Sequence, residues 1–348
     1  MSAPAGLAES AARVETRVAE FLRGEEARWA KVDADLVEPV RTLRQFGRSG
    51  GKRLRPAFVH WAFVGAGGTD LDLSASGGAA CELLHAFALL HDDVMDGSER
   101  RRGEPSIHRV YRERHDDAGW RGESRRFGEG VAILIGDLAF VYADRMLATA
   151  PPDARAVWDD LRTEINIGQY LDVIGSARGD VDIEAARRIA TYKSAKYTVE
   201  RPLHLGAALA GRFDELAQPL SAYGLPLGEA FQLRDDLLGV FGDADATGKP
   251  VGDDLREGKP TVLLALARQR SDRTQARVLR QVGSPDLTDA NVAEIQDVLR
   301  TTGAAGELEE RITALADEAI AAVGTAGLTP QASEALVELA RHVAFRDR

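Results

Sequence analysis

Apolar residues recur at intervals of three and four along most of the chain, which is the spacing of one face of an α-helix. Alternating runs of Val, Ile and Thr, which would predict strands, are rare. Asp182 and Thr288 stand where helix N-caps are expected, and Gly211, Gly283 and Gly324 stand where helices should end. The pattern therefore predicts an all-α fold, with helices over residues 8–32, 75–96, 130–149, 154–178, 183–211, 218–241, 260–282, 288–301, 305–323 and 330–345.

Two polar, glycine-rich stretches, residues 97–128 and 242–259, interrupt the helical pattern and are predicted to be long loops. Neither stretch has the character of a domain linker, because helical periodicity of similar composition resumes on both sides. We therefore predict a single domain over residues 1–348, with residues 1–10 flexible.

Composition narrows the classes of function. The chain has 348 residues, of which 44% are hydrophobic, so it can bury a large core. Its formal net charge of −11 argues against a general nucleic-acid-binding protein, because phosphate backbones are held by surplus Lys and Arg. The single cysteine, Cys81, excludes an intramolecular disulfide. No signal sequence and no uncharged apolar run near the roughly 18 residues of a membrane span is visible, so we expect a soluble, cytoplasmic protein.

The segment HDDVMDGSERRRGEP, residues 91–105, places acidic residues at the end of an apolar helix. At about 100° per residue, Asp92 and Asp96 project from nearly the same side one turn apart, and Asp93 is within reach of Asp96. Their repulsion is costly unless a cation is bound. Mg²⁺ suits such a site, because it takes one or two carboxylates together with substrate phosphates. The alternative is a solvated, charged helix end.

A second apolar helix, LGEAFQLRDDLLGVFGD over residues 227–243, also ends in adjacent aspartates, Asp235 and Asp236. Two such helices would let one metal cluster be held from opposite walls of a cavity. Basic residues supply the complementary charge: arginine grips phosphate oxygens bidentately, and lysine acts as a point charge. They gather in GGKRLRP (Lys52, Arg53 and Arg55), in RRRG at 100–103, and at Lys249 and Lys259. The two sets together predict a site for diphosphates.

The chain resembles the trans-isoprenyl diphosphate synthase (polyprenyl synthetase) family in six motifs that follow one another over about residues 40–265: GGKRLRP, ELLHAFALLHDDVMDGSERRRGEPSIH, GQYLD, YKSAKYT, FQLRDD and GKPVGDDLREGKPT. An aspartate-rich motif followed by RRG is far more specific than DDxxD alone. The resemblance implies a single large helical bundle around a central active-site cavity, usually as a homodimer. It also implies a prenyltransferase that condenses isopentenyl diphosphate with allylic diphosphates.

The resemblance assigns roles to individual residues. Three Mg²⁺ ions would be held by Asp92, Asp96, Asp235 and Asp236, with Asp93 orienting the first motif. The allylic diphosphate would contact Arg101, Lys193, Gln232 and Lys249, with Lys259 close by, and Ser194 is a further predicted substrate-binding residue. Isopentenyl diphosphate would be held without metal by Lys52, Arg55, His85 and Arg102. Gln169 and Asp172 would face the same cavity. Of these residues, Asp92, Asp93, Asp96, Asp235 and Lys193 are the predicted catalytic groups.

The expected chemistry needs no nucleophilic side chain. The metal-bound diphosphate leaves, and the double bond of isopentenyl diphosphate attacks the allylic cation. A proton is then lost, and the family resemblance implies that the departed pyrophosphate accepts it. His91 is predicted to be a structural hydrogen-bonding group. The sequence departs from the family at Gly239, where much of the family has the last aspartate of the second motif. We expect this change to weaken support of the metal more than its direct ligation, and activity to survive.

Product length should depend on residues beneath the first motif. Helical rotation puts Ala88 nearly under Asp92, with Leu84 below and Phe87 to one side. The resemblance implies that an aromatic residue at the position of Phe87 limits elongation, whereas small Ala88 leaves more room than in the tightest C15 enzymes. The first motif also lacks the two-residue insertion of many bacterial farnesyl diphosphate synthases. These features favour a C20 product. The alternative interpretation of Phe87 is that it only packs between helices.

Several alternatives to this function stay open. The product could be C15 or longer than C20. A class I terpene cyclase would also use an aspartate-rich helix, but its usual second metal motif is not found and the basic residues call for a second diphosphate. A non-catalytic partner subunit of a heteromeric synthase would usually have lost aspartates, and both DD pairs are present here.

Overall fold

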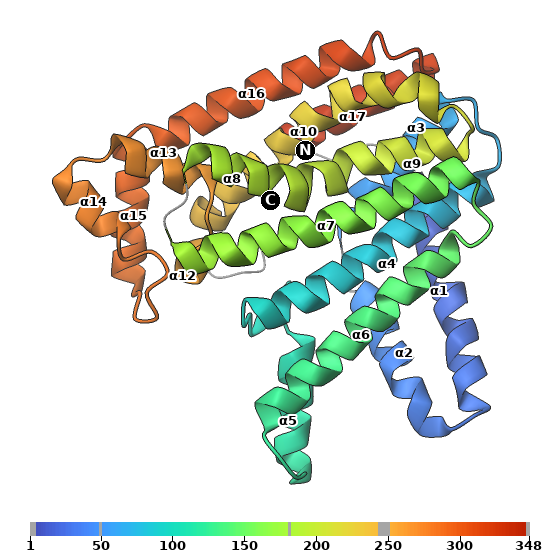
Figure 1. The fold of residues 1–348 in the computed structure, drawn as a ribbon, viewed down its shortest axis with the longest axis horizontal. Helices are drawn as coiled ribbons and strands as arrows, with labels where there is room; N and C mark the ends of the chain where they lie inside the picture. Colours follow the sequence, from blue (N-terminus) through green and yellow to red (C-terminus); the bar gives the residue numbers. More distant parts are fainter. Residues whose placement is uncertain (1–4, 49–50, 180–181, 243–250, 346–348) are drawn as a thin grey trace. The chain divides into compact units, whose positions relative to one another are not determined.

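The computed structural model describes residues 5–48, 51–179, 182–242 and 251–345, and most of them are helical (Figure 1). The prediction of an all-α fold is therefore confirmed. Within the described residues the only sheet is a short hairpin of β1 (Arg100–Arg101) and β2 (Glu104–Pro105). The chain forms two compact units, an N-terminal unit of 5–60 and 68–151 and a C-terminal unit of 61–67 and 152 onward. The prediction of a single domain over 1–348 stays a prediction.

The N-terminal unit is built around α4, which packs along α6 and against α1. Seven consecutive small residues, 74–80, are buried on α4 and let its neighbours approach closely. A Cβ at Gly78 would lie 2.6 Å from Val14 Cγ2, so a larger residue there would push the helices apart. The helices of this unit are α1 (Ala5–Ala30), η1 (Ala34–Val37), α2 (Glu38–Arg48), α3 (Leu54–Gly65, whose last residues belong to the other unit), α4 (Leu71–Met95), α5 (Ile107–Ala118) and α6 (Ser124–Met146).

The prediction of a long loop over residues 97–128 is wrong. This stretch contains the β1–β2 hairpin, the helix α5 and the first turn of α6. The buried residues of α5 are His108, Tyr111 and His115, so the helix lacks the apolar periodicity that marks the others. Its contact with α6 is close, because a Cβ at Gly128 would clash with the carbonyl oxygen of His108.

The C-terminal unit is centred on the long helix α10, which packs against η2, α9, α16 and α17. Its elements are α7 (Pro152–Arg178), α8 (Ile183–Ala190), the π-helix η2 (Thr191–Glu200), α9 (Arg201–Leu209), α10 (Phe213–Phe241), α12 (Asp253–Glu257), α13 (Val262–Arg270), α14 (Arg273–Leu279), α15 (Asp289–Thr301), α16 (Ala304–Val323) and α17 (Pro330–Ala344). Leu237, Val240, Leu263, Ile295 and Ile312 are among the apolar side chains of its core.

Two predicted helix starts are confirmed, and two predicted elements need correction. Asp182 accepts a hydrogen bond from the Ala185 N–H at 2.7 Å, and Thr288 accepts one from the Asn291 N–H at 3.3 Å. The helix expected over 260–282 is instead α13 and α14, because Asp272 caps α14 in a capping box with Gln275. The loop expected over 242–259 contains the short helix α12.

Among the described helices, α4 alone has the length and apolar composition of a membrane span. Asp72, Glu82 and Asp92 interrupt it, which is why no uncharged run stands out in the sequence. In its most apolar window, 67% of the helix is buried inside the fold. Most of its apolar surface is therefore covered by protein, as in the core helix of a soluble protein.

Candidate active site

The first aspartate motif forms the end of α4 and is held by Arg101. Asp93 is buried, and Asp96 caps the helix, donating its backbone N–H to the Asp92 carbonyl at 2.8 Å. Arg101 donates from Nε to Asp93 Oδ1 at 2.7 Å, and its Nη2 lies 3.4 Å from Asp92 Oδ2. Burial lowers the pKa of the Arg101 guanidinium, but Asp93 and Asp92 outweigh burial and the net pKa is raised. This ion pair offsets the repulsion between the two carboxylates.

The β1–β2 hairpin places Arg101 opposite Glu104 and turns at Arg102 and Gly103. Both turn residues have positive φ, 52° and 81°, which is the geometry of a type I′ turn. An arginine in this conformation costs about 1 kcal/mol or more. Among the described residues the only other non-glycine with positive φ is Arg53, at 48°. Each basic segment of the N-terminal unit thus contains one strained arginine, and such strain is typical of functional sites.

Arg53, one of the basic residues that the sequence grouped for a diphosphate, instead anchors its segment, and this role was not predicted. Its guanidinium pairs with Glu82 of α4 and, at 3.0 Å, with Glu15 of α1, and it donates to the Gly47 carbonyl at 2.8 Å. The signal in the sequence was Glu82, a carboxylate in the apolar part of α4 that needs a cation nearby. Lys52, which precedes Arg53, is exposed.

His85 lies among arginines that come from both basic segments. Burial lowers the pKa of its imidazole well below the usual range, and Arg55, Arg102, Arg101 and Arg53 lower it further. Burial also lowers the pKa of the Arg102 guanidinium, as do Arg101 and Arg53. The imidazole is therefore neutral near pH 7, and the surrounding guanidiniums repel one another. An anion bound here would relieve that repulsion, so the arrangement is suited to a diphosphate held without metal.

The residues beneath the first motif are packed between α4 and α6. Leu84 is fully buried, and the Phe87 ring lies 4.8 Å from the Phe140 ring and 4.5 Å from the His91 ring. His91 Nε2 is hydrogen-bonded to the Ile133 carbonyl at 3.1 Å. His91 therefore makes a structural hydrogen bond of the predicted kind. Ala88 is half-buried, and the roles of Leu84, Phe87 and Ala88 in product length stay predictions.

The second aspartate motif lies near the end of α10. Asp236 is buried and accepts a hydrogen bond from Gln232 Nε2 at 2.7 Å, whereas Asp235 is half-buried. Burial raises the pKa of Asp236 to about 8; Gln232 opposes this shift, and Asp254 and Asp235 add to it. Without a cation the Asp236 carboxyl is thus mostly protonated near pH 7. Its assignment as a metal ligand stays a prediction.

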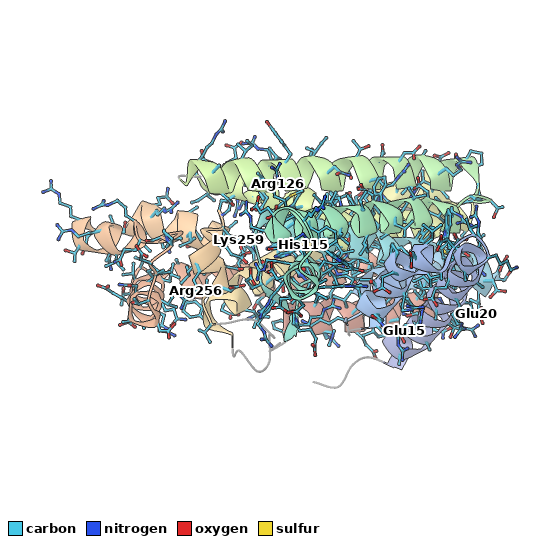
Figure 2. The ribbon with its side chains drawn as sticks, turned by 90° about the horizontal axis from the view of Figure 1, so that it is seen from below. Glu15, Glu20, His115, Arg126, Arg256 and Lys259 are labelled. Atoms are coloured by element: carbon cyan, nitrogen blue, oxygen red, sulfur yellow. The ribbon has the colours of Figure 1, made fainter. Side chains whose placement is uncertain are left out.

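A carboxylate from another segment fills the space beside Gly239. A Cβ at Gly239 would clash with Oδ2 of Asp254, which belongs to α12. Lys259, which follows α12 (Figure 2), has its Nζ 2.6 Å from Glu257 Oε2 and 3.6 Å from Asp254 Oδ1. Sequence reasoning missed Asp254, although it lies inside the quoted GKPVGDDLREGKPT motif. Lys249 lies outside the described residues.

Lys193 of η2 lies against α7. Its Nζ lies 2.5 Å from Oδ2 of Asp172, whose side chain is buried. One turn earlier on α7, a Cβ at Gly168 would clash with the backbone of Lys193. The predicted pair Lys193 and Asp172 is therefore brought together. Gln169 is half-buried on the same helix, and Ser194 follows Lys193 in η2.

The donors of the first motif fit Mg²⁺, although the described side chains do not form a complete cage by themselves. Among the described residues, no three His, Cys, Asp or Glu side chains form a ready metal cluster. Asp92 and Asp96, one turn apart near the end of α4, offer the hard oxygen ligands that Mg²⁺ prefers. Mg²⁺ usually completes its shell with water and substrate phosphates, so a partial set of carboxylates is what such a site requires.

The all-α fold, the aspartates near the ends of α4 and α10 and the separate groups of basic residues fit the isoprenoid-synthase class of protein. A profile of the polyprenyl synthetase family matches residues 38–301. The geranylgeranyl diphosphate synthase of Mycobacterium tuberculosis is 34% identical over 306 residues, which cover 86% of this chain and 81% of that protein. The octaprenyl diphosphate synthase of Escherichia coli is 32% identical over 334 residues, which cover 92% and 96%.

A solved structure agrees with these sequence relatives. The geranylgeranyl pyrophosphate synthase from Corynebacterium glutamicum, complexed with isoprenyl diphosphate and magnesium, has a TM-score of 0.93 and 38% identity, with 98% of this chain and 99% of that chain covered. The chain belongs to the polyprenyl synthetase family. It is a trans-prenyltransferase, and the family's substrates are isopentenyl diphosphate and allylic diphosphates. These relatives are named as synthases of both shorter-chain and longer-chain prenyl diphosphates.

Proposed function

We propose that this protein is a geranylgeranyl diphosphate synthase that extends dimethylallyl, geranyl or farnesyl diphosphate with isopentenyl diphosphate. The observation that carries the proposal is the presence of two kinds of anion site. The arginines around His85 suit a diphosphate without metal, whereas Asp92 with Arg101 suits a diphosphate that arrives with Mg²⁺. A C20 product is supported by Phe87 beside Ala88 and by likeness to synthases of that name.

The residues divide the work between the two substrates. Lys52, Arg55, His85 and Arg102 hold isopentenyl diphosphate, and Arg101, Lys193, Ser194 and Gln232 hold the allylic diphosphate, with Lys249 and Lys259 nearby. Gln169 and Asp172 belong to the site of the allylic diphosphate, and Asp172 holds Lys193 through their ion pair. Three Mg²⁺ ions, with ligands from Asp92 and Asp96 and from Asp235 and Asp236, would neutralise the charge that develops on the leaving diphosphate.

The reaction breaks the allylic C–O bond and one C–H bond, and it forms a C–C bond and an O–H bond. The allylic C–O bond breaks, and its electron pair leaves with the diphosphate. The double bond of isopentenyl diphosphate then attacks the allylic carbon. The new cation loses a proton to the departed pyrophosphate, which restores an alkene. Arg101 and Lys193 donate to the diphosphate oxygens as their negative charge grows.

Product analysis tests this proposal. Purified protein and Mg²⁺ are incubated with isopentenyl diphosphate and, in turn, with dimethylallyl, geranyl or farnesyl diphosphate. We expect a C20 product from each primer, and no product from Asp92→Asn under the same conditions. A stop at C15, or a ladder of C30 and longer products, would retain the mechanism and overturn the C20 assignment. Folded protein that extends none of the primers would instead indicate a non-catalytic partner subunit.

We also propose that the enzyme is a cytoplasmic homodimer. Ile133, Leu134 and Val141 of α6 are large apolar residues with 40%, 67% and 53% of their surface exposed, and their spacing of seven and eight residues puts them on one side of the helix as a surface for a partner subunit. Sedimentation equilibrium should give twice the 37.6 kDa mass of the chain. Leu134→Glu should shift the protein towards monomer, and a monomeric wild type would contradict the proposal.

A further inference from the structure

The helix that carries Lys193 has an unusual geometry. Residues Thr191–Glu200 form a π-helix between α8 and α9, and the Arg201 N–H bonds to the Lys196 carbonyl, five residues back. Long π-helices are rare because an α-helix of the same residues has better hydrogen-bond geometry. Contacts from outside η2 must therefore hold it in this form.

Glycines on two neighbouring helices allow a close approach to the backbone of η2. A Cβ at Gly168 of α7 would clash with the Lys193 backbone. On α10, Cβ atoms at Gly228 and Gly224 would lie 2.5 Å from Ala195 Cα and 2.9 Å from Glu200 Cα. Because these contacts involve backbone atoms, no side-chain rotation would relieve them. The π-helix fits closely between α7 and α10.

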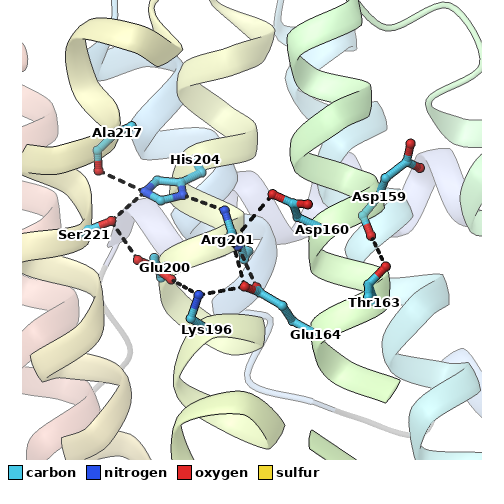
Figure 3. Close-up of polar contacts among 10 residues, drawn as sticks. All are labelled: Asp159, Asp160, Thr163, Glu164, Lys196, Glu200, Arg201, His204, Ala217 and Ser221. Atoms are coloured by element: carbon cyan, nitrogen blue, oxygen red, sulfur yellow. Dashed lines mark hydrogen bonds and ion pairs between the residues drawn. The ribbon is translucent and has the colours of Figure 1, made fainter. Parts of the chain in front are cut away.

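A row of carboxylates on α7 faces the cations of η2 and α9. Asp160, Glu164, Gly168 and Asp172 are spaced four residues apart, so they share one face of α7. Glu164 is the centre of this row: its Oε1 lies 2.7 Å from Lys196 Nζ, and its Oε2 accepts from Arg201 Nε at 2.7 Å (Figure 3). The side chains of Glu164, Lys196 and Arg201 are 15%, 18% and 13% exposed, so solvent screens them weakly.

The opposite side of η2 is attached to α10. Ser221 donates to Glu200 Oε1 at 2.7 Å and lies 3.0 Å from His204 Nε2 (Figure 3). Burial lowers the pKa of His204, so its ring is neutral near pH 7. The polar network thus ties the end of η2 to α10 at Ser221 and to α7 at Glu164.

We propose that Glu164 is a positioning residue for Lys193, which extends the function proposed above. Neutralising Glu164 removes the main counter-charge of Lys196 and Arg201, and relaxation of η2 towards an α-helix would let these cations reach solvent. That relaxation changes the register by one residue, which turns a side chain by about 100° about the helix axis. Lys193 would then leave Asp172 and the allylic diphosphate.

Glu164→Gln tests the proposal, with Asp159→Asn as the matched control. Asp159 is on the same helix and pairs with Arg162, but it is 67% exposed and has no contact with η2 in Figure 3. We expect Glu164→Gln to lower kcat/KM for geranyl diphosphate about tenfold, within the range of coupling between contacting residues. KM for isopentenyl diphosphate should be unchanged, and Asp159→Asn should resemble the wild type. A Glu164→Gln variant that resembles Asp159→Asn would overturn the proposal.

A double-mutant cycle decides whether Glu164 acts through Lys193. In a Lys193→Met background, Glu164→Gln should change kcat/KM by less than about twofold, because the group that it positions is gone. Fully additive losses would mean that Glu164 acts otherwise. If Glu164→Gln does not fold, Lys196→Met removes a cation of the same network and should give the same selective loss.

Hydrogen exchange separates this proposal from the proposed function. A wild type without condensation activity would refute the function and leave the anchoring of η2 testable. Amides of residues 191–200 should exchange faster in Glu164→Gln than in the wild type, whereas Asp159→Asn should leave them unchanged. Equal protection in all three proteins would refute the anchoring, whatever their activity.

Discussion

The carboxylate of Asp254 occupies the space that a side chain at residue 239 would take. Gly239→Ala should therefore displace a flexible carboxylate rather than backbone, and alanine favours the helix by about 1 kcal/mol over glycine. We expect the melting temperature to hold or rise. If Asp254 supports the metal, the Mg²⁺ concentration for half-maximal condensation should rise about tenfold, as for other residues that orient metal ligands. A magnesium titration of the initial rate measures this.

Two further variants control for the change at Gly239. Gly306→Ala places a methyl group where the structure has open space, so its magnesium requirement should match the wild type. Gly239→Asp also displaces Asp254, but it supplies a carboxylate from α10 itself and should need less Mg²⁺ than Gly239→Ala. An unchanged requirement in Gly239→Ala would show that Asp254 has no part in metal binding.

Phe87 provides a second prediction for a single residue. Its ring packs against Phe140 and His91, so Phe87→Ala leaves a space beneath the first motif. If Phe87 limits the growing chain, the main product should lengthen by at least one C5 unit. Because Phe87 is only half-buried, the loss of stability should be below the roughly 3–5 kcal/mol of a fully buried site. Chromatography of the dephosphorylated products gives the chain length.

Phe127→Ala is the matched control for Phe87→Ala. Phe127 packs against Tyr111, His115 and Trp120, so its loss disturbs aromatic packing in the same unit without opening space under the motif. Its product should stay that of the parent. If Phe87→Ala also leaves the product unchanged, Phe87 is a packing residue and the product limit lies elsewhere.

Among the elements, the β1–β2 hairpin combines strain with a predicted binding role. Arg102→Gly removes the positive-φ strain and one charge from a group of mutually repelling arginines. The melting temperature should therefore stay or rise. KM for isopentenyl diphosphate should rise about tenfold or more, because a hydrogen bond to a charged group is lost. Steady-state kinetics with each substrate varied in turn shows whether only the KM for isopentenyl diphosphate changes.

Arg102→Ala separates the two effects of that change. Alanine loses the charge but keeps a side chain at positive φ, so its KM should match that of Arg102→Gly while its melting temperature is lower. If neither variant changes KM for isopentenyl diphosphate, the assignment of Arg102 to that substrate is wrong.

The elements that could be predicted from sequence are those with local causes. Apolar periodicity located the long helices, and the N-caps Asp182 and Thr288 lie where side-chain chemistry puts them. Helix α5 could not be found this way, because its buried face is polar and aromatic. The π-helix η2 has its cause in other segments, namely the close contacts of Gly168 and Gly228.

The residues of the candidate site likewise fall into those that the sequence identified and those that depend on tertiary contacts. Residue type and motif spacing identified the aspartates and the basic segments. Contacts between segments distant in sequence could not be foreseen, such as Arg53 with Glu82 or Asp254 beside Gly239. These contacts depend on tertiary packing, which motif spacing does not encode.

At the scale of the whole molecule, the net charge of −11 opposes the approach of diphosphates. Binding must therefore depend on local groups of cations such as the arginines around His85. The same burial that concentrates these charges keeps histidines neutral. Burial is the first cause that lowers the pKa of His85, His108 and His204, so all three histidines link stability to pH.

The pH dependence of stability follows from this shift. In the unfolded chain a histidine titrates near 6.5, whereas each of these three titrates lower in the folded protein. Below about pH 6.5 the unfolded state thus binds more protons, and stability falls as the pH drops from 6.5 towards the folded pKa values. Thermal denaturation between pH 7.5 and about 5.5 should show a falling melting temperature across this window.

His204 allows this dependence to be tested at one site. Its ring is hydrogen-bonded to the Ala217 carbonyl and to Ser221. Burial lowers its pKa, Glu200 opposes this shift, and Arg201 and Lys196 add to it. His204→Gln keeps a polar side chain that does not titrate, so part of the fall in melting temperature below pH 6.5 should disappear. Because burial outweighs Glu200 in setting this pKa, the variant should lose less stability on acidification than the wild type. A steeper fall in His204→Gln would mean that Glu200 dominates and that protonated His204 stabilises the network.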